Sequence, residues 1–217
     1  MRKTINQFHN VHLRTWDSSD IEGYANLLSD PETMKYISAG TIRDHNAATK
    51  EIYTFQQEIA KRGWSRWAVS LGANAPFIGY SGFAEKECGI NFGARYLSEY
   101  WGTPYPMAAN CLALEYGFKQ LKFEKIHLRV NINHKYALNN ISTFLLQKKP
   151  TGTIVNTPFG PHLKIVVTHK KFMEVFPHNI ARVRRILERT QKNSPPEIIE
   201  NNLPSITGNI INCQNTA

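Results

Sequence analysis

Cysteine is scarce in this chain. Three cysteines occur among 217 residues, and Cys88, Cys111 and Cys213 stand far apart in the sequence. No Cys-x-x-Cys, His-Glu-x-x-His or other paired Cys/His spacing is present, so neither a structural metal site nor a disulfide framework is expected. Unpaired thiols are typical of a reducing compartment. We therefore predict no bound metal and a cytoplasmic location.

Long hydrophobic runs are also missing. No apolar stretch approaches the roughly 18–20 residues that a membrane-spanning helix needs. The N-terminus has basic residues but no apolar segment behind them, unlike a secretory signal. The sequence predicts a soluble protein without a membrane partner.

Acidic residues are outnumbered. Lys and Arg total 26 against 17 Asp and Glu, which leaves a net charge of +9 and a pI near 9.5. This balance favours anionic partners without distinguishing nucleotide phosphates, nucleic acid or an acidic membrane surface. Hydrophobic residues make up 41% of the chain, enough for a packed core, and the length suits one domain with extensions.

Periodic patterns predict an alternation of strands and helices. Four helices are predicted, one between Asp17 and Asp30 and the others at 44–62, 107–121 and 138–145. Alternating or β-rich segments predict strands at 8–16, 67–71, 77–83, 90–97, 125–130, 152–156 and 163–170. This order indicates an α/β (α+β) fold with a mixed sheet.

The C-terminal region changes character. We divide the chain into a domain at 1–172, a basic amphipathic helix at 173–192 and an unstructured Asn-, Pro- and Ser-rich tail at 193–217. The helix could contact RNA, an acidic lipid surface or the protein's own acidic surface, or pack on the domain as a solvated amphipathic helix. It lacks the interleaved aromatic residues of a single-strand binder, which makes nucleic acid an unlikely partner. Its basic side chains are Arg182, Arg184, Arg185 and Arg189.

One stretch carries a family resemblance. The segment Ile90–Gly102, INFGARYLSEYWG, closely resembles the GCN5-related N-acetyltransferase (GNAT) superfamily, in particular its RimJ/RimL-type branch, which acetylates ribosomal-protein N-termini. Further similar segments follow in the right order over about residues 8–170. The resemblance implies a single GNAT-type domain with a twisted mixed sheet of about six to seven strands, splayed in the middle, with helices on both faces.

The resemblance also implies acetyl-CoA as co-substrate. The backbone of Ala94, Arg95 and Tyr96 would pair with the pantetheine arm like an added strand, and a bulge there would aim an N–H at the thioester carbonyl. Asn139 matches the position that hydrogen-bonds the pantetheine. A turn opening a helix would hold the pyrophosphate with backbone N–H groups. The residues at that turn are Trp101, Gly102, Thr103, Tyr105 and Met107.

This phosphate loop is degenerate. The family's Gly-x-Gly-x-Ala turn reads Gly102-Thr-Pro-Tyr-Pro106 here, and each proline deletes one N–H donor. Pro106 could serve as the first helical residue. The segment could also be a proline-stabilised loop before a core helix. The surviving donors are those of Thr103, Tyr105, Met107 and Ala108.

The catalytic positions depart from the family as well. Asn91 stands where relatives carry an acidic residue, and Leu146 stands where many carry a tyrosine acid. Ser142 is the candidate for protonating the departing thiolate, although Asn139 and Ser142 could instead cap the last core helix. A free α-amine has a pKa near ~8, against ~10.4 for lysine, so it needs no strong base. The predicted acceptor is therefore a protein N-terminal α-amine or a weakly basic small-molecule amine.

Two alternatives to a direct-attack N-acetyltransferase remain at this point. One is a catalytically inactive GNAT-fold protein that acts as a binding or interaction module, through its cleft or its basic tail. The other is an RNA- or ribosome-binding module. A ribosomal or other protein partner is compatible with an N-acetyltransferase and with an inactive binding module. We interpret Cys111, on the apolar face of its helix, as core packing, and His127 and His134, without metal-ligand spacing, as solvated or packed.

Overall fold

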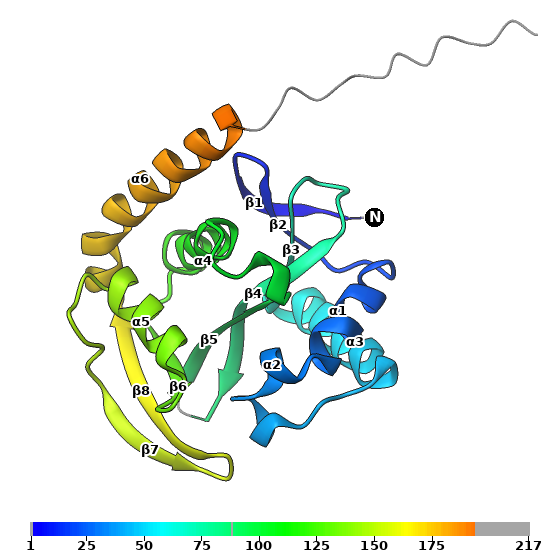
Figure 1. Ribbon diagram of the computed structural model, residues 1–217, viewed down its shortest axis with the longest axis horizontal. Coiled ribbons are helices and arrows are strands. Elements are labelled where there is room, and N and C mark those ends of the chain that lie inside the picture. Colours follow the sequence, from blue (N-terminus) through cyan, green and yellow to red (C-terminus); the bar gives the residue numbers. More distant parts are fainter. Residues whose placement is uncertain (1, 88, 194–217) are drawn as a thin grey trace, which may run out of the picture.

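The computed structural model describes residues 2–87 and 89–193, which contain one eight-stranded mixed sheet (Figure 1). The strand order is β1-β2-β3-β4-β5-β6-β8-β7, and among the described residues only β5 and β6 are parallel neighbours. The strands are β1 Thr4–Phe8, β2 Val11–Arg14, β3 Arg66–Ser70, β4 Phe77–Lys86, β5 Gly89–Tyr96, β6 Lys125–Asn131, β7 Thr153–Thr157 and β8 Gly160–Thr168.

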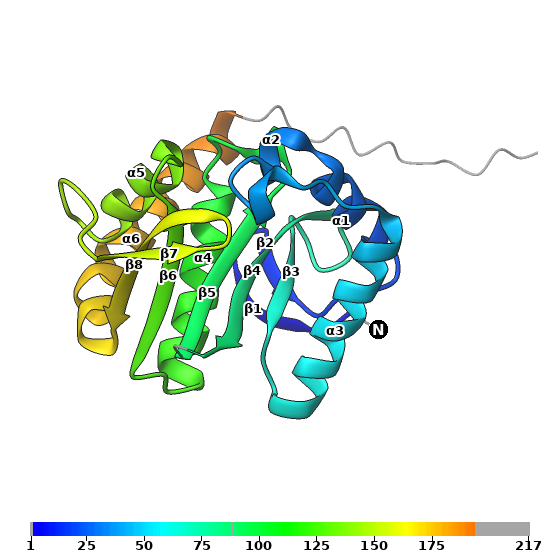
Figure 2. The same ribbon diagram turned by 90° about the horizontal axis from the view of Figure 1, so that it is seen from below.

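Helices cover both faces of the sheet (Figure 2). Helices α1 Asp20–Ser29, α2 Pro31–Met34 and α3 His45–Arg62 lie on one face, and α4 Tyr105–Glu115, α5 Lys135–Phe144 and α6 His169–Asn193 lie on the other. Short 3-10 turns at Ser38–Gly40 and Ser98–Tyr100 and a π turn at Tyr116–Gln120 complete the described elements. The predicted fold class is confirmed, with one strand more than expected.

Helix α3 shows why these segments form where they do. Its apolar residues Ala48, Ile52 and Phe55 recur every three or four positions and are buried against the sheet, the spacing of one helical face. The side chain of Asp44 accepts a hydrogen bond from the N–H of Ala47 and caps the N-terminus. Gly63, with φ 81°, ends the helix in the left-handed conformation that glycine adopts without strain.

The N-terminal strand prediction needs a correction. Residues 8–16 do not form one strand, because β1 and β2 are joined by a two-residue turn at 9–10 with Phe8 opposite Val11. His9 supplies the positive φ, 52°, that such a tight turn requires. Neither residue of the turn is the glycine that marks a hairpin in sequence, which explains why β1 was missed. With both neighbours present, β2 lies inside the sheet and is covered on both faces.

The last helix is part of the main core. Helix α6 begins at His169, four residues before the predicted start, and its apolar residues Phe172, Phe176 and Val183 are buried with those of α4 and the sheet. The rings of Phe172 and Phe118 stack with centroids 4.6 Å apart. The boundary at 172 stays a prediction, and residues 194–217 of the proposed tail lie outside the described residues. No helix that the structure describes is long and apolar enough to cross a membrane.

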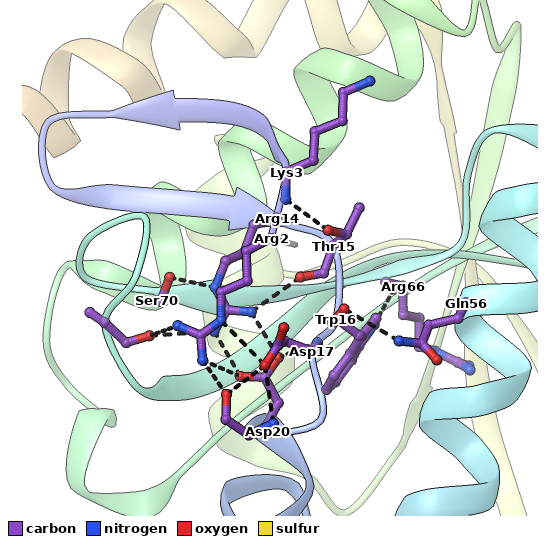
Figure 3. A network of polar contacts seen from close by, with 12 residues as sticks. Arg2, Lys3, Arg14, Thr15, Trp16, Asp17, Asp20, Gln56, Arg66 and Ser70 are labelled. Atoms are coloured by element: carbon purple, nitrogen blue, oxygen red, sulfur yellow. Dashed lines mark hydrogen bonds and ion pairs between the residues drawn. The ribbon is translucent and has the colours of Figure 1, made fainter.

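A buried ion pair fixes α1 against β2 (Figure 3). The terminal nitrogens Nη1 and Nη2 of Arg14 each donate to a carboxylate oxygen of Asp20 at 2.8 Å, and neither side chain is exposed to solvent. Arg14 Nε also donates to Ser70 Oγ at 2.9 Å, and the N–H of Asp17 donates to Asp20. The arginine therefore has its charge matched and its donors used, which is the condition for burying a charge at low cost.

Candidate functional site

The sheet separates between β5 and β6. The parallel ladder between the two strands contains a single residue pair, Asn91 opposite His127, near the starts of both strands. No pairing between described residues follows toward the ends at Tyr96 and Asn131, so the β6-facing backbone groups of β5 find no strand partner there. Carboxyl ends of parallel strands at such a break are where α/β proteins bind ligands.

Strand β5 itself is regular. It pairs with β4 without a register shift, from Lys86 opposite Gly89 to Gly79 opposite Tyr96. The bulge that the family resemblance implied at Ala94–Tyr96 is therefore not present, and this expectation was wrong. An unbroken ladder to β4 holds all of β5 in extended geometry, so its free edge is straight up to the end of the strand.

Helix α4 starts directly after the end of β5. Its first residue is Tyr105 rather than Pro106, and Pro104 stands at the N-cap. Two of the four predicted donors are already used, because the N–H of Thr103 donates to Tyr100 and that of Ala108 donates to Pro104. Among the described residues the N–H groups of Tyr105 and Met107 make no backbone hydrogen bond. They point out of the positive end of an 11-residue helix.

Tyr96 and Trp101 tie the end of β5 to this turn. The indole Nε1 of Trp101 donates to the carbonyl of Tyr96 at 2.9 Å, which occupies one of the backbone groups predicted to pair with pantetheine. The hydroxyl of Tyr96 donates to Asn110 Oδ1 on α4 at 2.7 Å. Burial raises the pKa of Tyr96 far above its ordinary value, so its proton stays on the hydroxyl. Asn110 was not singled out from the sequence, since only the fold brings it beneath Tyr96.

Asn139 and Ser142 both lie within α5, which follows β6. The helix begins at Lys135 with His134 at the N-cap, so the reading of these two residues as caps was wrong. Ser142 is buried, and its hydroxyl donates to the carbonyl of Leu138 at 3.0 Å. Asn139 is exposed. The structure thus places α5 beside the separated strands but does not bring Ser142 into hydrogen-bond contact with the other predicted residues.

Two polar side chains meet where β5 and β6 touch. Asn91 and His127 are directly opposite each other and so project from the same face of the sheet. Asn91 Oδ1 and His127 Nδ1 are buried and have no hydrogen-bond partner among the described residues. Burial, followed by the charges of Lys164, Lys125 and Arg129, lowers the pKa of His127, so the ring is neutral at physiological pH.

A ring stack connects the two halves of the sheet at the open end. The rings of Tyr36, after α2, and His134, before α5, stack with centroids 4.4 Å apart and an interplanar angle of 18°. Burial lowers the pKa of His134. Both predicted histidines are therefore packed side chains, and no group of three metal-ligating side chains occurs within residues 2–87 and 89–193.

Three arginines gather on the α1–α3 face of the sheet, and sequence reasoning did not foresee this. Arg95 lies on β5, Arg66 on β3 and Arg43 in the segment before α3. The Cζ atoms of Arg66 and Arg95 each lie 5.7 Å from the ring centroid of Tyr80 on the intervening strand β4. Burial, and next the charge of Arg95, lowers the pKa of Arg43. Of the three, only Arg95 was a predicted site residue, and for its backbone.

Known proteins share this architecture. The family profile described as "Acetyltransferase (GNAT) domain" matches residues 10–139, more than half of the chain. YkkB of Bacillus subtilis is 23% identical over 133 residues, 59% of this chain and 76% of that protein. A GNAT-family acetyltransferase from Bacillus anthracis superposes with a TM-score of 0.63 at 16% identity, covering 76% of this chain and 98% of that one. RimJ of Mycobacterium smegmatis, solved with CoA-disulfide, has a TM-score of 0.62 at 13% identity, with 81% and 90% covered.

Proposed function

The chain belongs to the acetyltransferase (GNAT) domain family, and from this premise we propose that it transfers an acetyl or other short acyl group from acetyl-CoA to an amine. The observation that carries the proposal is the separation of β5 from β6 directly beside the start of α4. A free strand edge and free helix N–H groups then lie at the two ends of one short connection. No feature of the described residues favours the alternative, an inactive binding module.

The residues present fit a coenzyme A thioester. The unpaired N–H groups of Tyr105 and Met107 suit an anionic pyrophosphate at the positive end of α4. The edge of β5 at Ala94 and Arg95 suits the amide-bearing pantetheine arm, which can hydrogen-bond like a strand, and the proposed contact extends to Tyr96, whose carbonyl already accepts from Trp101. Trp101, Gly102 and Thr103 form the connection between β5 and α4. On the β6 side of the site, the exposed Asn139 on α5 is the proposed side-chain contact to the pantetheine.

Acetyl-CoA supplies an activated acyl group when it is bound, so the protein's contribution is to orient the reactants and to manage protons. Burial raises the pKa of Cys111 to about 12. This thiol therefore stays protonated, and direct attack by the amine is proposed rather than an acyl-cysteine route. Ser142 keeps a proton at Oγ, beside α5's own carbonyl of Leu138, and we assign it the protonation of the leaving group.

The acceptor is proposed to be a protein N-terminal α-amine or a small-molecule amine, with a ribosomal or other protein as partner in the first case. An α-amine with a pKa near ~8 is already partly neutral at physiological pH. No carboxylate base is then required where Asn91 stands on β5. A mass-spectrometric screen of peptide and small-molecule amines with acetyl-CoA identifies the acceptor.

Calorimetric titration of the full chain with acetyl-CoA tests the binding site. Substitution Pro106→Ala adds an N–H donor in the first turn of α4 and should tighten binding about fivefold, the effect of one net hydrogen bond of about 1 kcal/mol. Pro76→Ala, in the exposed turn before β4, serves as the matched control and should leave the affinity unchanged. Absence of binding at millimolar acetyl-CoA in both the parent and Pro106→Ala would refute the proposal.

Steady-state kinetics test the role of Ser142. Substitution Ser142→Ala should lower kcat about 100-fold, the contribution of a positioned proton donor, and leave the KM for acetyl-CoA unchanged. Thr143→Ala, the next residue on the same helix, is the control. An unchanged kcat for Ser142→Ala would assign the proton to water instead.

A further inference from the structure

The three arginines form one cluster on the α1–α3 face of the sheet. Arg66 reaches across β4 from β3, so that a Cβ added to Gly93 on β5 would lie 3.9 Å from Arg66 Nε. Gly93 stands between Asn91 and Arg95, and all three face the same side because alternate residues of a strand do so. The guanidinium groups of Arg66 and Arg95 therefore both lie beside the Tyr80 ring on this face of the sheet.

Arg43 approaches the same place from the segment before α3. It forms an ion pair with Glu51, which also accepts a hydrogen bond from the hydroxyl of Tyr24. Tyr24 in turn lies within electrostatic reach of Arg95, Arg66 and Arg43, whose charges partly offset the effect of burial in raising its pKa. The three cations thus surround one aromatic pair, Tyr24 and Tyr80, whose rings have centroids 5.9 Å apart.

The charges in this cluster do not balance. Glu51 is the single carboxylate that forms an ion pair with any of the three arginines within the described residues, and Arg66 and Arg95 form none. The Nε atoms of Arg43 and Arg66 are buried and lack a hydrogen-bond acceptor among those residues. Partly buried guanidinium donors without acceptors are unfavourable, whereas a bidentate anion satisfies this fork-shaped group well.

The position of the cluster connects it with the acceptor. Arg95 lies on the strand whose free edge is proposed to hold the thioester arm, and its Nη1 is 3.5 Å from Met34 Sδ at the end of α2. Tyr36, two residues later, stacks on His134 at the open end of the sheet. A molecule held by the arginines would therefore lie along β5, under the segment that follows α2.

We propose that Arg43, Arg66 and Arg95 bind an anionic group of the acceptor, so that the substrate is an amine that also carries a carboxylate or a phosphate. The proposal rests on the proposed function and names the substrate class of the same site. It excludes polyamines as preferred acceptors, since two uncompensated positive charges repel a polycation. Whether the bound anion is a carboxylate or a phosphate is determined by comparing matched acceptor substrates.

The experiment compares acceptors with and without the anion, and each kcat/KM is expressed per neutral amine because the anion also raises the pKa of the amine. An α-amino acid is paired with its amide, and phosphoethanolamine with ethanolamine, with spermidine as the polycation. Acetyl transfer by the full chain should show a kcat/KM at least tenfold higher for one anionic member than for its neutral partner, and the pair that responds identifies the anion. Equal rates within both pairs, or a preference for spermidine, would overturn the proposal.

Substitution Arg66→Met assigns the effect to the cluster. It should raise the KM for the anionic acceptor about 10- to 100-fold without changing the affinity for acetyl-CoA in calorimetry. Arg129→Met, an exposed arginine on β6, is the matched control and should change neither value. Arg43→Gln is a second variant in case Arg66→Met misfolds. An anion preference that survives both cluster variants would contradict the assignment.

Failure of the proposed function can be distinguished from failure of the anion site. If the chain binds no acetyl-CoA, the cluster is tested alone by calorimetry with an N-acetylated amino acid and with inorganic phosphate. Binding of one of them that is lost in Arg66→Met and retained in Arg129→Met supports the anion site. No binding of either refutes it.

Discussion

Two arginine sites of this protein differ in how their charges are paired. Arg14 on β2 faces the bidentate carboxylate of Asp20, with Ser70 accepting from its Nε, and every contact comes from the chain itself (Figure 3). The cluster of Arg43, Arg66 and Arg95 has Glu51 as its one ion-pair carboxylate within the described residues and leaves two buried Nε donors without an acceptor.

The difference separates a structural charge from charges that are proposed to bind a ligand. A buried arginine that is fully paired contributes to holding α1 on the sheet, and its removal leaves an opposite charge stranded. A group of arginines with missing acceptors carries unfavourable energy that the fold tolerates and that a ligand can relieve. The comparison predicts opposite responses to substitution at the two sites.

The largest effect is expected at the balanced site. Asp20→Asn leaves the buried Arg14 without its carboxylate and should lower the free energy of unfolding by about 3–5 kcal/mol. Urea denaturation followed by circular dichroism measures it. Asp17→Asn is the control, because Asp17 is partly exposed and its carboxylate contacts Ser19 and Arg2 at the surface, so its loss should be under about 1 kcal/mol. Similar losses for both variants would remove the distinction drawn above.

An intermediate pair of effects is expected within the cluster. Arg43→Met removes the partner of Glu51 and should lower the free energy of unfolding by about 1–2 kcal/mol. Arg66→Met removes a charge with no carboxylate and should change it by less than about 1 kcal/mol in either direction, since lost contacts with Phe55 and Tyr80 offset relieved repulsion. The same urea titration compares them. If Arg66→Met destabilised the protein as much as Asp20→Asn, the cluster would be a structural element.

The smallest effect concerns His12, a titratable side chain beside the balanced site. Burial, and then the charge of Arg14, lowers the pKa of His12 below its ordinary value of 6.5. The unfolded chain therefore takes up this proton more readily than the folded protein, so the stability that a neutral His12 provides is complete above about pH 6.5 and decreases as the pH falls below it. Unfolding titrations at pH 7 and pH 5 should show a smaller loss for His12→Gln than for the parent chain. An equal loss in both would mean that His12 does not contribute.

Local patterns in the chain were sufficient for most of the fold. The helix at 45–62 has its apolar period, its Asp44 cap and its Gly63 stop within the segment itself, and the predicted range of 44–62 is therefore close. The hairpin at 4–14 was missed because its turn depends on His9 adopting a left-handed conformation, and the turn contains no glycine that would indicate this in the sequence. The helix α6 starts earlier than predicted because Phe172 is held by Phe118, a contact between distant segments.

The candidate site divides in the same manner. The order of β5, the proline-containing turn and α4 was visible in residues 90–121, and so was the family resemblance. The hydrogen bonds of individual N–H groups could not be predicted in this way. Whether the N–H of Thr103 or Ala108 is free depends on where the carbonyls of Tyr100 and Pro104 lie. For Ser142, burial and a hydrogen bond to Leu138 replaced the predicted capping alternative. The sites of acetyl-CoA and of the acceptor remain proposals.

Hydrophobic period and turn chemistry by themselves determined the class of this protein and most of the order of its elements, because both depend on residues close together in the chain, and the separation of the sheet was implied by the family resemblance. Tertiary structure alone decided which charges are matched. Arg14 and Asp20 are six positions apart and pair completely, whereas Arg43, Arg66 and Arg95 come from three separate elements. Electrostatic energy depends on distance and burial in space, and neither can be read from positions along a sequence.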